Sequence, residues 1–206
     1  MAIDGRLLGR RAQLTRQRLL EATAALLAEH GIRDLRVVDI ARNVGTSPAT
    51  FYQYFRDVEE AVLALVEGLR DDLLPLLEEL QEPMRGRNGL ESARRLMDGF
   101  ITYWDEHRAV LRVRNLAAEE GDARFREVRT RTLGSITEEL RKQIAENQEA
   151  GKVDAEVHPY AAAAAMVAMM ERMAAYHLDL EPRGLPRGDL VETVARIIHQ
   201  TVAGKR

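Results

Sequence analysis

The chain has 206 residues, of which 46% are hydrophobic and 31% charged, and its formal net charge is −3. This composition is that of a globular chain with room for one large or two modest domains. Cysteine is absent, which excludes disulfides, thiolate catalysis and cysteine-ligated zinc. No signal-peptide pattern and no run of about 18 apolar residues occurs, so we expect a cytoplasmic protein that does not span a membrane.

The charge is unevenly distributed along the chain. Residues 1–56 hold nine arginines and five acidic residues, which gives +4 and leaves −7 for the remainder. A basic segment on an otherwise acidic protein is typical of a DNA-binding end, although runs of charge are more often solvated surfaces.

The N-terminal residues predict an arm followed by a helix. Residues 1–13 contain Arg6, Arg10 and Arg11 without helical periodicity, so we expect a basic arm that contacts phosphates or is disordered. From Thr15 the leucine spacing predicts an amphipathic helix, which His30-Gly31 should end.

Residues 37–55 predict two short helices joined by a tight turn. The first places Val37, Ile40, Ala41 and Val44 on one face, and it should end at a glycine in the left-handed conformation, Gly45. The hydroxyl of the next serine can cap the second helix, whose first position suits the proline that follows. Two helices connected in this way form a helix-turn-helix.

The outward side of the second helix carries no acidic side chain. We expect Phe51 and Phe55, four positions apart, to face inward. The outward residues are then Pro48, Ala49, Thr50, Tyr52, Gln53 and Tyr54. Hydroxyl, methyl and amide groups of this kind meet base edges in a DNA major groove. The pattern fits a plain helical hairpin on a protein surface as well, and Tyr54 fits a packed aromatic.

A fourth helix should follow at once. Asp57 with Glu60 three positions later predicts a capping box, and an apolar stripe continues to Leu80. Pro75 lies inside this stripe and should kink the helix or end it early. Residues 81–89 are rich in glycine and proline and predict a loop.

Taken together, these motifs are specific enough to indicate one family of proteins. A helix ending in E-H-G, then L-R-V-V-D-I-A-R-N-V-G-T-S-P-A-T-F-Y-Q-Y-F and an acidic cap, resembles the tetracycline-repressor (TetR) family of bacterial transcription regulators over residues 15–66. The resemblance implies three DNA-binding helices, an all-α regulatory domain that binds an effector, and a homodimer. It also implies the contacts of individual residues: base or groove contacts for Pro48, Ala49, Thr50 and Tyr52, base or backbone contacts for Gln53 and Tyr54, and phosphate contacts for Thr15, Arg16 and Thr46.

Two positions depart from the family pattern. The family commonly has a phosphate-binding lysine where this chain has Val58, and a serine or threonine where it has Arg36. We expect Arg56 or the N-terminal arginines to compensate for the missing lysine.

The rest of the chain predicts further helices and no strands. They cover residues 90–104, 109–118, 125–151, 159–178 and 189–203. We therefore predict an all-α protein of about nine helices, with a DNA-binding domain at 1–56 and a larger helical regulatory domain, for ligand binding and dimerisation, at 57–206.

The last two helices are too apolar for burial on one side only. Residues 159–178 are apolar nearly all round, and residues 189–203 carry apolar side chains on two sides. This favours a homodimer held by a four-helix bundle of these segments, which would present two recognition helices to a palindromic operator. The alternative is that both are core helices of a monomer.

Methionines and aromatics predict an effector site in the regulatory domain. The candidate lining residues are Met97, Phe100, Ile101, Trp104, Met166, Met169, Met170, Met173 and Tyr176. Flexible methionines adapt to varied apolar guests, although such a stripe also fits an ordinary core. Because no basic residue lies among them, we expect a small, mostly apolar effector whose single polar group meets Tyr103, Tyr176 or His177.

Catalytic motifs are missing from the sequence. The five histidines show no metal spacing, and no P-loop, dinucleotide fingerprint or catalytic triad pattern occurs. We therefore expect no enzyme activity, no metal and no cofactor. The leading hypothesis is a repressor released from double-stranded operator DNA by a small hydrophobic effector. The alternatives are a helix-turn-helix factor that lacks an effector, architectural or partnered with a protein, and an all-α carrier or lipid-binding enzyme.

Overall fold

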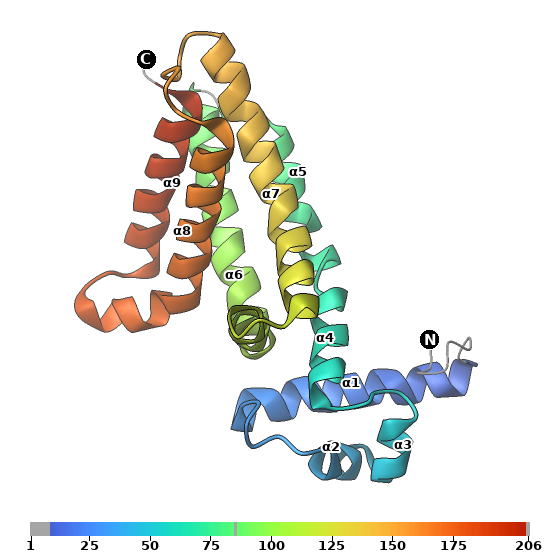
Figure 1. Cartoon of the computed structure of the whole chain (residues 1–206). Coiled ribbons are helices and arrows are strands. Elements are labelled where there is room, and N and C mark those ends of the chain that lie inside the picture. The colour runs from blue at the N-terminus through green and yellow to red at the C-terminus, as the bar shows by residue number, and fades with distance from the viewer. Residues whose placement is uncertain (1–8, 85, 205–206) are drawn as a thin grey trace. The chain divides into compact units, whose positions relative to one another are not determined.

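The computed structural model describes residues 9–84 and 86–204, without the side chains of residues 86 and 87. Every regular element in these ranges is helical, which confirms the predicted all-α fold (Figure 1). The α-helices are α1 (Arg10–His30), α2 (Val37–Val44), α3 (Pro48–Tyr52), α4 (Val58–Gly68), α5 (Leu74–Gln81), α6 (Gly86–Glu119), α7 (Ala123–Glu149), α8 (Pro159–Leu180) and α9 (Arg187–Ala203). Two 3₁₀ turns, Asp71–Leu73 and Glu181–Arg183, precede α5 and follow α8.

The N-terminal arm was expected at residues 1–13. Its first eight residues lie outside the described part of the chain, whereas residues 10–13 belong to α1. The first helix therefore begins at Arg10 and not at Thr15. It ends as predicted at His30, where Gly31 has a positive φ of 74°.

Two compact units make up the chain, and their bounds differ from the expected domains. The first unit runs to Arg70 and also contains residues 107–129, and the second comprises residues 71–106 with 130–206. The first unit is larger than the predicted domain because α4 and the adjoining ends of α6 and α7 share its core. The domain boundary expected between residues 56 and 57 stays a prediction.

The core of the first unit gathers side chains from distant parts of the sequence. Leu19 of α1, Ile40 of α2 and Phe51 of α3 are fully buried in it. From the later helices, Val110 and Phe125 complete the same cluster. Burial of apolar surface against α1, α4, α6 and α7 fixes the short α2 and α3 on this unit.

Residues 69–73 interrupt the expected fourth helix. The helix α4 ends at Gly68, a 3₁₀ turn follows, and α5 carries Pro75 in its first turn, where no amide donor is needed. Pro75 was predicted to kink this helix or end it early; the helix is interrupted, but at residues 69–73, and Pro75 lies at the start of the helix that follows. The loop predicted at 81–89 is shorter than expected, because α6 already begins at Gly86.

A single residue breaks the longest helix. His107, with φ −121° and ψ 16°, is non-helical inside α6. The two arms on either side of it correspond to the helices predicted at 90–104 and 109–118. The break falls where α6 passes from the second unit into the first.

Polar side chains tie the helices of the second unit together at its chain turns. The amide of Gln143 in α7 accepts a hydrogen bond from the backbone N–H of Met84 at 2.9 Å and donates one to the carbonyl of Leu80 at 2.6 Å. Asn147, one turn further along, donates to the carbonyl of Val202 in α9 at 2.9 Å. The connection from α5 to α6 and the end of α9 are therefore both fixed to α7.

Replacing Gln143 by alanine should lower the free energy of unfolding by about 1–3 kcal/mol, because a buried N–H and a buried carbonyl lose their partner. Chemical denaturation monitored by circular dichroism measures this change. The control Lys142→Ala removes an exposed side chain from the same turn and should change stability by less than about 0.5 kcal/mol. Equal effects of the two substitutions would contradict the role of Gln143.

Candidate DNA-binding surface

The turn between α2 and α3 is formed by Gly45 and its neighbours. Gly45 adopts the left-handed conformation, with φ 73° and ψ 36°, as its sequence position predicted. The N–H of Thr46 then donates to the carbonyl of Ala41 at 2.9 Å. Ser47 caps α3 by accepting a hydrogen bond from the N–H of Thr50 at 3.3 Å. The predicted helix-turn-helix is thus present.

Two phenylalanines anchor the recognition segment. Phe51 and Phe55 are 0% and 1% exposed, and their ring centroids lie 5.4 Å apart. This confirms that both face inward. The helix itself is shorter than expected, because α3 ends at Tyr52 and a non-helical turn carries the chain to Phe55.

The opposite side of this segment is open to solvent. Pro48, Ala49, Tyr52 and Gln53 are exposed, and the Tyr52 side chain retains 53% of its accessible surface. These are four of the residues for which base or groove contacts were predicted.

Three further residues with predicted DNA contacts, in the turn and around α3, are half-buried. The side-chain oxygens of Thr50 and Ser47 lie 3.1 Å apart, so the Thr50 hydroxyl supports the cap. The Thr50 side chain is also partly exposed. Tyr54 packs against the core of the first unit, as the packed-aromatic interpretation required. Thr46 is half-buried beside the turn. Their DNA contacts stay predictions.

The two α1 residues expected at phosphates have different surroundings. The Arg16 guanidinium lies over the ring of Phe55, with its carbon 5.1 Å from the ring centroid. This cation–π contact holds the charge beside the recognition segment. The hydroxyl of Thr15 donates to the backbone carbonyl of Arg11 at 3.1 Å, within the same helix.

The start of α4 is a capping arrangement, as predicted. Asp57 accepts a hydrogen bond from the N–H of Glu60 at 2.7 Å, and Glu60 in turn accepts from the Arg56 backbone and side chain. Burial opposes ionisation of Glu60, but these hydrogen bonds outweigh it and keep the pKa of its carboxyl below the ordinary value. The hydrogen bond from the guanidinium to Glu60 also raises the pKa of Arg56.

The hydrogen bonds between Arg56 and Glu60 affect whether Arg56 can replace the phosphate-binding lysine that the family commonly has at position 58. Val58 is half-buried and packs against the core of the first unit. Arg56 is held by Glu60, so the structure does not direct it to a phosphate in place of the lysine. At the other departure, Arg36 precedes α2 without a side-chain cap, where the family has a capping hydroxyl.

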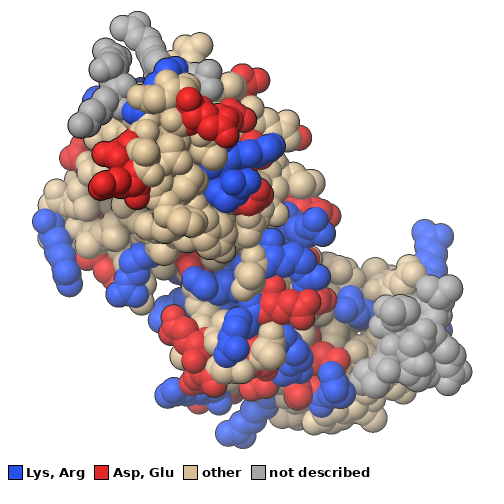
Figure 2. Space-filling model, turned by 45° about the horizontal axis from the view of Figure 1, so that its top comes forward, with Lys and Arg blue, Asp and Glu red and all other residues tan. Residues whose placement is uncertain are grey.

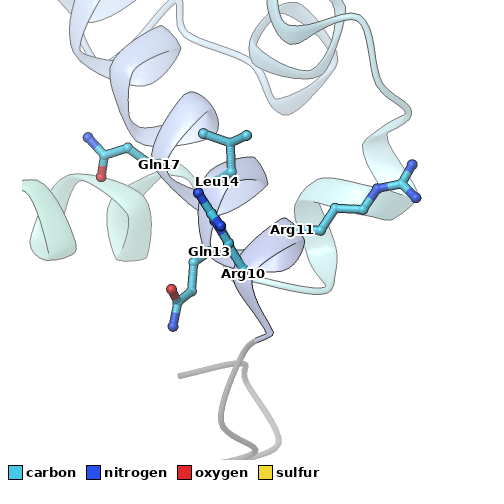
Figure 3. Close-up of a pocket in the computed structure, with 5 residues that line it drawn as sticks. All are labelled: Arg10, Arg11, Gln13, Leu14 and Gln17. Carbon is cyan, nitrogen blue, oxygen red and sulfur yellow. The ribbon is translucent and has the colours of Figure 1, made fainter.

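Basic side chains also line the first turns of α1. An open hollow there is lined by Arg10, Arg11, Gln13, Leu14 and Gln17 (Figure 3). Since all five belong to one helix, they form a polar surface with an exposed leucine and not an enclosed ligand site. In the face that Figure 2 shows, basic and acidic side chains are interspersed.

The residues predicted to line the effector site differ in their solvent exposure. Six of them are at most 3% exposed, namely Met97, Phe100, Ile101, Trp104, Met166 and Met170. Met169 and Met173 are half-buried. Tyr176 faces outward, contrary to its expected place in a pocket: it is 42% exposed and stacks with the Arg172 guanidinium, 3.8 Å from its ring centroid.

A polar cluster beside these residues was not predicted from the sequence. Buried His177 of α8 lies 3.1 Å from Asp105 of α6, between Nε2 and Oδ2. Arg187 reaches the same carboxylate at 3.6 Å and that of Asp98 at 2.8 Å. Because the partners are 72 to 89 positions apart, no local pattern could indicate this cluster.

Metal sites and membrane-spanning helices are both absent from the described residues. No group of three or more histidine or acidic side chains in them is arranged to hold a metal ion. None of the described helices combines the length and apolarity needed to cross a membrane.

Family models match most of the chain. The model for "Tetracyclin repressor-like, C-terminal domain" matches residues 77–206, and that for "Bacterial regulatory proteins, tetR family" matches residues 19–65. The helix-turn-helix thus belongs to a known class of transcription regulators. The chain belongs to the TetR family.

Solved structures share the fold along nearly the whole chain. A TetR-family regulator from Rhodococcus sp. is 22% identical, with a TM-score of 0.69 over 93% of this chain and 100% of that one. FadR from Bacillus subtilis, solved with stearoyl-CoA, is 16% identical, with a TM-score of 0.66 over 92% and 99%. SmeT, repressor of a Stenotrophomonas maltophilia multidrug efflux pump, is 17% identical, with a TM-score of 0.61 over 92% and 90%.

Tyr52→Ala should weaken binding to a duplex that this protein selects from a randomised library, by about 1–3 kcal/mol. Its ring is exposed, so the melting temperature should stay near that of the wild type. Fluorescence anisotropy with the selected and an unrelated duplex measures the effect, which should be small on the unrelated one. An unchanged preference would contradict the assignment of the groove-facing side.

Arg16→Ala should instead weaken both duplexes by a similar factor. Loss of one phosphate contact should flatten the dependence of log K on log salt by roughly one unit of slope. The control Arg16→Lys keeps the charge but loses the planar contact with Phe55, so it should retain most of the slope. An unchanged slope in the alanine variant would exclude a phosphate contact.

Proposed function

We propose that the protein is a homodimeric repressor that binds a palindromic operator and is released by a small, mostly apolar effector. The observation that carries the DNA-binding part is the exposed row of Pro48, Ala49, Tyr52 and Gln53 above the buried phenylalanine anchors. A rigidly held helix with uncharged hydrogen-bonding groups fits base readout in a major groove. Arg16 beside it fits a phosphate contact.

The proposed dimer interface is the outer face of α8 and α9. Ala161, Ala165 and Ala168 are exposed at positions i, i+4 and i+7, so they form one smooth stripe. Ile197 on the neighbouring α9 is 41% exposed. Small residues allow close helix approach, and an exposed isoleucine beside them favours a partner over solvent. A second copy of the chain supplies an identical face under two-fold symmetry.

Not every apolar residue of the segment 189–203 is available to this interface. Ile198 is 0% exposed within the single chain, where it packs in its own core together with Val194 and Ala195. A charge at Ile198 would therefore unfold the subunit and would not test dimerisation. The exposed residues on the outer face of α8 and α9 do offer a test of dimerisation.

Ala165→Asp should convert the dimer into a monomer at micromolar concentration, because the new carboxylate would be buried unpaired in the interface. Sedimentation velocity measures the change, and affinity for the selected duplex should fall with it. The control Ala25→Asp places the same charge at an exposed helical position of α1 and should leave the dimer intact. A dimer in both variants would locate the interface elsewhere.

The proposed effector site lies in the second unit, among the buried methionines and aromatics. Among its described residues no lysine or arginine is buried, so an anionic head group would lack a buried counter-charge. This supports a neutral, largely apolar effector. Among the proteins that share the fold, FadR from Bacillus subtilis was solved with stearoyl-CoA, and SmeT is the repressor of a multidrug efflux pump.

A neutral lipophilic effector at 100 times its dissociation constant should raise the free energy of unfolding by about 2.7 kcal/mol. Trp104, the single tryptophan, should report its binding through a change of emission. Tenfold weaker DNA binding requires about 1.4 kcal/mol of differential affinity, and DNA must then weaken effector binding by the same factor. If only charged or sugar-like compounds produced these signals, the apolar site would be refuted.

A further inference from the structure

The indole N–H of Trp104 is a buried hydrogen-bond donor without an acceptor. The side chain is 1% exposed, and its Nε1 atom has no hydrogen-bond partner in the described part of the protein. Leaving such a donor unsatisfied costs about 1–3 kcal/mol. Since most buried polar groups in native proteins have a partner, an acceptor from outside the chain, either water or a ligand, would satisfy this N–H.

On the N-terminal side of Trp104, its surroundings along α6 are apolar. Met97, Phe100 and Ile101 lie seven, four and three positions before it, on the same side of the helix, and are at most 1% exposed. A buried water needs two to four polar partners, and this stripe supplies none beyond the indole itself. An apolar molecule with its own acceptor suits such a position better than water.

Two of the other polar groups considered for the effector are engaged elsewhere. Tyr176 is on the outer face against Arg172, and His177 is hydrogen-bonded to Asp105. Trp104 is thus the donor on the predicted apolar stripe that has capacity to bind an incoming group.

We propose that the Trp104 indole N–H donates a hydrogen bond to an uncharged acceptor oxygen of the effector, such as a ketone, ester or ether oxygen. The inference rests on the proposed effector site and specifies its ligand class as neutral, apolar and acceptor-bearing. A carboxylate would satisfy the N–H but would bring a charge where the described second unit buries no cationic lysine or arginine. A pure hydrocarbon would leave the N–H unpaired.

Three matched probes separate these classes: 2-undecanone, undecane and decanoate. Since the chain has one tryptophan, an ¹⁵N-labelled sample gives one indole N–H resonance. The full-length protein should show a downfield shift of that proton with 2-undecanone and a markedly smaller shift with undecane. Decanoate should bind more weakly than the ketone. Binding of 2-undecanone without the indole shift would overturn the inference, as would decanoate binding as tightly as the ketone.

Trp104→Phe removes the donor and keeps an aromatic ring. Measured by calorimetry, its affinity for 2-undecanone should fall about tenfold, equivalent to about 1.4 kcal/mol, while that for undecane should change less than about twofold. Equal losses for both probes would overturn the inference and leave the apolar site standing. Failure of wild-type protein to bind any of the three would overturn the apolar site together with the inference. If the Trp104→Phe variant does not fold, the shift of the indole resonance in the wild-type protein still tests the inference.

Discussion

The position of the recognition helix depends on the burial of Phe51 and Phe55. A helix of five residues cannot be stable by itself, because its few hydrogen bonds do not offset the cost of nucleation. The serine cap and the glycine turn set its start, but only the two rings, held within the core of the first unit, set its orientation. Every outward contact proposed for Pro48, Ala49 and Tyr52 follows from these two inward ones.

The same core explains why the compact units do not coincide with the functional domains. Val110 and Phe125 belong to helices that run on into the second unit, yet they pack against residues of α1 to α3. The DNA-binding helices therefore share their core with the adjoining ends of α6 and α7. Since α6 and α7 each contribute residues to both units, these two helices connect the units covalently.

Local features of the sequence predicted the local structure well. Gly45, Ser47 and the Asp57–Glu60 pair each act within four residues, so their roles follow from the order of residues alone. Helix lengths were less predictable. Neither the end of α3 at Tyr52 nor the start of α1 at Arg10 was indicated by the apolar periodicity.

Long-range contacts were beyond sequence reasoning for the same reason. The outward position of Tyr176 could not be distinguished from an inward one, because α8 is apolar on most sides and gives no clear amphipathic face. The Asp105–His177 contact joins residues far apart in the chain. The apolar pattern of residues 189–203 could not separate interface positions from core positions, whereas in the structure Ile198 is completely buried within the subunit and Ile197 is exposed.

The two departures from the family pattern have different energetic consequences. At Arg36 the chain forgoes a capping hydrogen bond that typically contributes about 1 kcal/mol, which weakens a helix already held by Ile40 and Ala41 in the core. At Val58 it replaces a phosphate-binding charge by a side chain that packs against that core. Each lost phosphate contact removes about 0.9 from the salt slope of DNA binding and weakens all sequences alike. Because the loss is the same for every sequence, we expect the departure at Val58 to lower the affinity for all DNA while the preference for the operator, set by contacts from α3, stays the same.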